Sequence, residues 1–111
     1  MSLESEIYKL SFELSKSLSE NEINKLLGVL ASDGVYAMWV YAMDRFEDNK
    51  NIIIELIKKL DNFVMGKKQN YINNQYFQEL AKDLNKLLFM KELLEKVLIY
   101  ARYHKRAGED K

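Results

Sequence analysis

The sequence predicts an all-α protein in which residues 1–111 form a single compact bundle of five or six helices. Three observations lead to this fold class. The chain has 111 residues, which is the size of one domain. It contains no proline and only four glycines, so little interrupts a helix and few positions allow the tight turns of a many-stranded sheet. Apolar residues make up 48% of the chain and recur at helical spacing along most of its length.

Two amphipathic helices are expected in the first third of the chain. The first is predicted over residues 3–17, where apolar residues lie one helical turn apart. Before the second helix, Ser19 and Glu22 have the spacing of a capping box, in which each side chain accepts a hydrogen bond from the other residue's backbone N–H. The second helix should end at Gly34, which permits a left-handed turn, or at Asp33, which can cap the next helix.

The third predicted helix covers residues 34–47 and is apolar on every side from Val35 to Met43. A helix without a polar face is normally surrounded by protein. We therefore expect this helix to be the central element of the bundle, with Trp39 close to the middle of the core.

A fourth helix is expected to begin after Asp48 or Asn49, either of which can cap it. Its run Ile52–Ile54 is β-branched and also suits a strand, but the helical period continues well beyond that run and favours a helix. Gly66 should end this helix, and residues 66–73 form the predicted loop.

The last third of the chain, from Asn74 to Arg106, has a helical apolar period and no helix breaker. One helix of that length is unusual in a domain of this size. We favour a break near Asp83–Asn85, where either end residue can cap a new helix. A single long helix is the alternative.

The residue inventory excludes the common catalytic sites. There is no cysteine, which removes a disulfide framework, a thiolate metal site and a cysteine nucleophile. His104 is the only histidine, so a two-histidine zinc site cannot be built. Asp44, Glu47 and Asp48 place three carboxylates on one helical face and can hold a hard cation, although such a cluster is more often a solvated helix end. We therefore expect a binding protein, not an enzyme, with no cofactor and no metal.

The longest apolar run, Val35 to Met43, is far shorter than the roughly 20 residues of a membrane-spanning helix. The first residues are acidic and amphipathic, without the basic region and apolar run of a secretory signal. We expect a soluble, cytoplasmic protein with no membrane partner.

Charge is unevenly distributed along the chain although the net charge is zero. Residues 1–48 carry four basic and nine acidic side chains, whereas residues 49–111 carry thirteen and eight. This asymmetry is typical of a protein whose one end meets a polyanion or the acidic end of a neighbour. An ordinary solvated surface can also produce it.

The basic residues towards the C-terminus form the most informative pattern. Four of them fall within about one-third of the helix circumference at 100° per residue, and Tyr100, Tyr103 and His104 lie among them. Basic side chains bind phosphates and aromatic rings stack on unpaired bases, so the pattern suits single-stranded nucleic acid. Basic residues at a helix C-terminus also favour the macrodipole, which accounts for them without a ligand. With two lysines of the predicted loop, the candidate nucleic-acid contacts are Lys67, Lys68, Lys91, Arg102, Lys105 and Arg106.

The stretch from Phe89 to Lys105 resembles the final helix of the small subunits of type III CRISPR effector complexes. In the Csm version that helix has an Ala/Tyr-rich end with a basic residue between two tyrosines, here Tyr100-Ala101-Arg102-Tyr103. Upstream, Leu30–Val35 and the apolar helix after it resemble the segment before an apolar helix in the Cmr version. The type I-A small subunit is similar in size and helical character.

This resemblance implies a non-catalytic protein of five or six helices whose copies stack along the ribonucleoprotein and pack against its backbone subunits. It also implies contact with the target strand through basic residues. The expected partner is a single-stranded nucleic acid, with RNA favoured and DNA left open. The six candidate residues rest on charge placement and not on matched family motifs. The leading hypothesis is therefore a small subunit of a CRISPR effector complex. The alternative is a helical adaptor with protein partners only, in which the charge asymmetry orders head-to-tail contacts.

Overall fold

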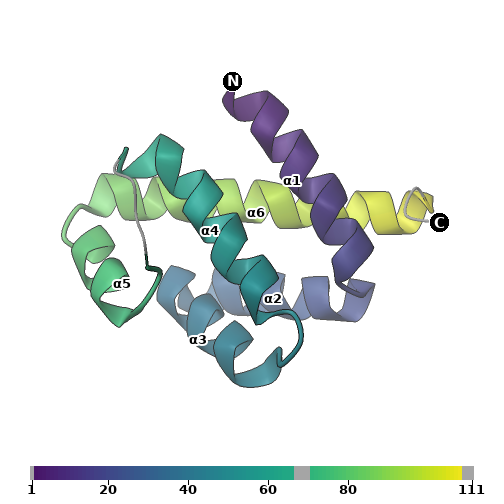
Figure 1. Cartoon of the computed structure of the whole chain (residues 1–111), viewed down its shortest axis with the longest axis horizontal. Coiled ribbons are helices and arrows are strands. Elements are labelled where there is room, and N and C mark those ends of the chain that lie inside the picture. Colours follow the sequence, from purple (N-terminus) through teal and green to yellow (C-terminus); the bar gives the residue numbers. More distant parts are fainter. Residues whose placement is uncertain (1, 67–70, 109–111) are drawn as a thin grey trace.

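The computed structural model describes residues 2–66 and 71–108. Within these residues the chain forms six helices and no strand, which confirms the all-α prediction. The helices, shown in Figure 1, are α1 (Leu3–Ser17), α2 (Glu20–Asp33), α3 (Val35–Arg45), α4 (Lys50–Val64), α5 (Asn74–Ala81) and α6 (Leu84–Ala107).

The 24-residue helix α6 is the central element of the fold, and it contacts each of the other five helices. α1 and α4 cross the same side of α6, and α2 runs along it (Figure 1). At 1.5 Å per residue α6 is about 36 Å long, close to the 40 Å long axis of the molecule. Its length is what lets five shorter helices share one apolar face, which consists of Met90, Leu93, Leu94, Val97, Leu98 and Ala101.

The prediction that residues 34–47 form the central helix was wrong. α3 packs on α2 and α4 and leaves another side uncovered, so Tyr36 is 48% exposed and Val40 is 42% exposed. Trp39 is half-buried at the edge of the core, and its indole Nε1–H has no hydrogen-bond partner among the described residues. An apolar surface on every side of a helix favours burial but does not determine which helix lies at the centre. With only 11 residues, α3 is too short to contact every other helix as α6 does.

Side-chain caps fix two of the helix starts where the sequence predicted them. The Ser19 backbone N–H donates to Glu22 Oε1 at 2.9 Å, and the Glu22 N–H donates to Ser19 Oγ at 3.1 Å, which completes the capping box of α2. The Asp83 carboxylate accepts from the Lys86 N–H at 3.2 Å and begins α6. The expected break between α5 and α6 is therefore confirmed.

Two other turns agree with the predicted residues but differ in detail. Asn49 occupies the cap position of α4, yet its side-chain amide donates to the Ser17 carbonyl oxygen at 3.5 Å and does not cap the helix. Gly66 follows the end of α4 with a φ of 70°, a conformation that glycine adopts without strain. Of the loop predicted over residues 66–73, residues 67–70 lie outside the described part of the chain.

Candidate functional site

The described residues of the predicted basic stripe lie at two places along α6. Arg102 and Arg106 lie one turn apart beside the N-terminal half of α2, where Arg106 Nε is 3.2 Å from Glu20 Oε2 and Arg102 donates to Asn24 Oδ1 at 3.3 Å. Lys105 is half-buried on the same final turns. Lys91 is 11 residues before Arg102, about 16 Å along the helix. The structure therefore separates Lys91 from the other three residues.

Packing between α2 and α6 explains much of this charge without a ligand. The Glu20 carboxylate is in the first turn of α2 and Arg106 is in the last turn of α6, so each favours the dipole of its own helix and the two attract one another. Arg102 is half-buried, and its Nε–H has no hydrogen-bond partner among the described residues. Lys67 and Lys68, the other two candidates, lie outside the described residues.

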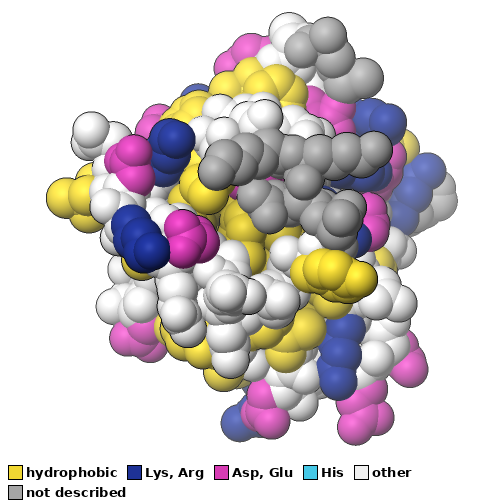
Figure 2. All heavy atoms as spheres, turned by 60° about the vertical axis from the view of Figure 1, so that its left-hand side comes forward, with side chains coloured by type: hydrophobic (Ala, Val, Ile, Leu, Met, Phe, Trp, Pro, Cys, Tyr) yellow, Lys and Arg dark blue, Asp and Glu magenta, His cyan; other side chains and the backbone are white. Residues whose placement is uncertain are grey.

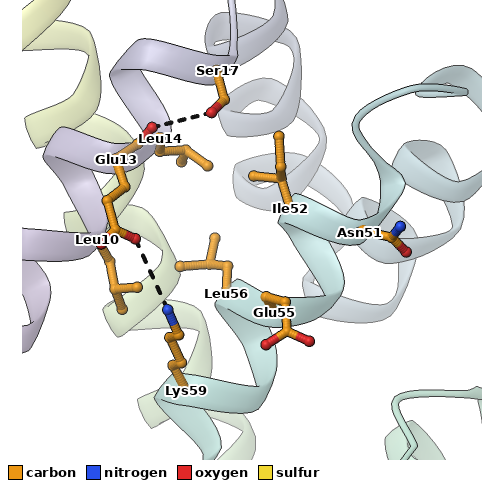
Figure 3. Close-up of a pocket in the computed structure, with 9 residues that line it drawn as sticks. All are labelled: Leu10, Glu13, Leu14, Ser17, Asn51, Ile52, Glu55, Leu56 and Lys59. Carbon is orange, nitrogen blue, oxygen red and sulfur yellow. Dashed lines mark hydrogen bonds and ion pairs between the residues drawn. The ribbon is translucent and has the colours of Figure 1, made fainter.

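A first groove lies between α1 and α4 and has a volume of about 260 Å³. Its floor is apolar, with Leu14, Ile52 and Leu56 directed into it (Figure 3). Across its rim Lys59 Nζ lies 3.9 Å from Glu13 Oε2, so this ion pair spans the two helices over the groove. The groove is a shallow seam between packed helices, and none of its residues was predicted as a site.

A second groove lies between the start of α3, α5 and the first turns of α6, with a volume of about 280 Å³. We call it the α3–α5–α6 groove. Its wall is apolar and its rim carries Asp33 and Lys91, neither of which forms an ion pair with another described residue. Hydrophobic side chains reach the surface between polar ones on the α5 end of the molecule (Figure 2). The groove is lined by the apolar residues Val35, Tyr36, Phe77, Ala81, Leu87 and Leu88. The exposed residues Val40 and Leu84 lie one helical turn after Tyr36 and one turn before Leu88.

A third hollow, between α1 and the C-terminal turns of α6, has a volume of about 520 Å³. We call it the tyrosine hollow. The Tyr8 and Tyr100 ring centroids are 6.0 Å apart at 54°, and the Tyr8 hydroxyl donates to Glu4 Oε2 at 2.8 Å. The hydrogen bond to Glu4 raises the pKa of Tyr8 above its ordinary value, because the carboxylate favours the protonated hydroxyl. The hollow is lined by Tyr8, Ser11, Tyr100, Tyr103, His104 and Ala107.

Sequence reasoning found three residues of the tyrosine hollow and missed the other three. Tyr100, Tyr103 and His104 were noted because they lie near basic residues on one helix. Tyr8 and Ser11 come from α1, about ninety residues away in the sequence, and only the packing of α1 on α6 brings them there. The abundance of tyrosine, seven in all, was the one available signal.

The carboxylates Asp44, Glu47 and Asp48 do not converge. Among the described residues no group of three or more His, Cys, Asp or Glu side chains is placed to hold a metal ion. Asp44 instead pairs with Arg45, whose Nε lies 3.2 Å from Asp44 Oδ2. No helix of the described chain has the length and apolar character needed to cross a membrane.

Comparison with known proteins adds no relative to this picture. No protein-family model, no curated protein and no solved structure matches the chain.

Proposed function

We propose that this protein is a non-catalytic small subunit of a CRISPR ribonucleoprotein effector complex in the cytoplasm. In this role it packs against backbone subunits, and against further copies of itself, and contacts the target RNA strand. The resemblance of Phe89–Lys105 to the final helix of type III small subunits supports the family assignment. A single helical bundle is compatible with a purely structural and binding role.

The observation that carries the assembly part of the proposal is the uncovered apolar face around the α3–α5–α6 groove. Tyr36, Val40, Leu84 and Leu88 are all large apolar residues left exposed on adjoining elements. Exposed apolar surface of this kind, rimmed by polar groups, marks interaction sites on soluble proteins. A groove between helices with such a wall suits the apolar stripe of a partner's amphipathic helix.

The alternative, a helical adaptor that binds proteins only, is favoured by the contacts of the basic residues themselves. Arg106 already pairs with Glu20 and Arg102 with Asn24, so both guanidinium groups have intramolecular partners. To bind a phosphate, Arg106 must exchange one anion for another. In the adaptor hypothesis these residues serve to hold α2 on α6.

Salt-dependent RNA binding distinguishes the two candidates. Fluorescence anisotropy of a labelled single-stranded RNA is measured with the protein at about 50 and 200 mM salt, a range over which phosphate contacts weaken steeply. We expect binding that weakens at the higher salt. Absence of binding at the lower salt contradicts the RNA-contacting role and supports the protein-only adaptor.

A charge-matched pair of variants tests the candidate residues. Neutralising the four described candidates should weaken binding to any RNA sequence about equally and reduce its salt dependence. The control removes the same number of positive charges from other elements. If both variants lose the same affinity, net charge and not this site is responsible. The variants are K91Q/R102Q/K105Q/R106Q and, as the control, K25Q/K50Q/K58Q/K82Q.

A further inference from the structure

We infer that the tyrosine hollow binds an unpaired base of single-stranded nucleic acid by stacking, with Tyr103 as the main contact. This inference rests on the proposed function, because it names where the strand meets the chain. The proposed contact with the strand is therefore not at Arg102 and Arg106, whose guanidinium groups have intramolecular partners on α2.

The chemistry of the lining distinguishes this hollow from the α1–α4 groove and the α3–α5–α6 groove. Branched aliphatic side chains form the walls of the α1–α4 groove and much of the wall of the α3–α5–α6 groove, as suits helix packing. The tyrosine hollow has none. It is built from three phenol rings, one imidazole, one serine and one alanine, and no carboxylate lines it. Planar rings offer π-faces, and the planar ligands that stack on such faces without regard to sequence are nucleobases.

Three of the four rings are held in place before any ligand arrives. Tyr8 is fixed by its hydrogen bond to Glu4 and by its contact with Tyr100. The His104 ring meets the Phe12 ring edge to face, with centroids 5.4 Å apart. Rings that are already ordered lose little conformational freedom on binding, which favours affinity.

Tyr103 is the ring that remains available. It is 57% exposed and makes no ring contact or hydrogen bond with another described residue. Tyr103 lines the hollow and more than half of its surface is exposed, so its ring can be reached by a base. A ring with free faces next to ordered ones is the arrangement that stacking requires.

A cation lies near the hollow on the α1 side. Lys16 Nζ is 4.4 Å from the centroid of the Phe12 ring, and Phe12 in turn contacts His104. Lys16 is exposed and can meet the phosphate that follows a stacked base. The Glu4 carboxylate accepts a hydrogen bond from the Tyr8 hydroxyl. A nucleotide matches this combination of rings and cation, because its base supplies the planar ring and its phosphate supplies the anion.

The test compares single-stranded RNA with an abasic strand of the same length and charge. Anisotropy titrations at about 50 mM salt use the parent protein, Tyr103→Ala and Tyr103→Phe. The control is Tyr71→Ala, which removes a 74% exposed tyrosine before α5. We expect Tyr103→Ala to weaken RNA binding by about 5- to 150-fold, the loss of one stacked base. Tyr103→Phe and Tyr71→Ala should bind as the parent does.

The abasic strand completes the design. It should bind the parent about as weakly as RNA binds Tyr103→Ala, and Tyr103→Ala should bind both strands equally. If the parent binds RNA but Tyr103→Ala binds it equally well, stacking in the hollow is refuted while the RNA-contacting function stands. The same holds if the parent does not distinguish the abasic strand. If the parent binds no RNA at all, both the proposed RNA-contacting function and the stacking site fail.

Discussion

The Tyr76 hydroxyl donates a 2.6 Å hydrogen bond to Oδ1 of Asp61, and both side chains are buried where α5 meets α4. Asp61 Oδ2 has no hydrogen-bond partner among the described residues. Burial raises the pKa of the Asp61 carboxyl, while the bond from Tyr76 and the charge of Lys86 lower it in part. Burial and the adjacent carboxylate raise the pKa of Tyr76 as well, so Tyr76 stays a donor.

Asp61 should make the folded state less stable as the pH rises. Its pKa is higher in the folded than in the unfolded chain, so its stabilising contribution is complete below the ordinary pKa of about 4 and is lost as the pH rises through the raised value. Asp61→Asn keeps an oxygen for Tyr76 and carries no charge. We expect the variant to gain stability relative to the parent between pH 4 and 7 in urea unfolding, by an amount that grows with pH. A difference that does not change with pH contradicts the buried carboxylate.

Tyr76→Phe should destabilise the fold at pH 7. The change leaves the buried Asp61 carboxylate without its donor, and an unsatisfied buried group costs about 1–3 kcal/mol. Urea unfolding with Tyr71→Phe as control isolates the effect, because Tyr71 is exposed and its hydroxyl has no partner among the described residues. Equal losses in the two variants mean that the hydroxyl of Tyr76 does not support Asp61.

Ser19→Ala should cost about 0.5–2 kcal/mol, the usual loss when a helix N-cap side chain is removed. The substitution deletes the acceptor for the Glu22 N–H and leaves Glu22 with half of the capping box. Ser32→Ala is the matched control, since Ser32 is exposed near the end of α2 and bonds only to the Gly28 carbonyl oxygen. Free energies of unfolding measured by circular dichroism should be lower for Ser19→Ala than for Ser32→Ala. If Ser32→Ala loses as much stability as Ser19→Ala, the Ser19 side chain does not act as a stabilising N-cap.

Two helix starts could be predicted from local capping residues, whereas the arrangement of the helices in the bundle could not. The start of α2 at Ser19 and the break at Asp83 follow from side chains that bond to the backbone three residues on, an interaction contained within the local sequence. Which helix lies at the centre depends on length and on contacts between distant segments. The apolar surface of Val35–Met43 therefore suggested the wrong central helix.

Only those features of the candidate site that lie within a single helix could be predicted from the sequence. The spacing of Arg102 and Arg106 on a helical face was correct, but the sequence gives no sign that Glu20 and Asn24 of α2 lie opposite them. The contact of Tyr8 with Tyr100 depends on how α1 crosses α6, which periodicity does not determine. Contacts between α2 and α6 give Arg102 and Arg106 intramolecular partners, and the sequence of one helix cannot reveal them.

Because α6 and not α3 is the central helix, truncating an apolar side chain should lower the free energy of unfolding more in α6 than on the exposed side of α3. Leu94 of α6 is fully buried, so Leu94→Ala should cost about 2–5 kcal/mol through lost burial and the cavity left behind. Val40 of α3 is 42% exposed, and Val40→Ala should change stability by no more than about 0.5 kcal/mol. Both variants are measured by urea unfolding of the isolated protein at one pH. If Val40→Ala costs as much as Leu94→Ala, Val40 is covered in solution and this side of α3 is not an exposed apolar face. If Leu94→Ala is nearly neutral, α6 is not the helix that the other five share.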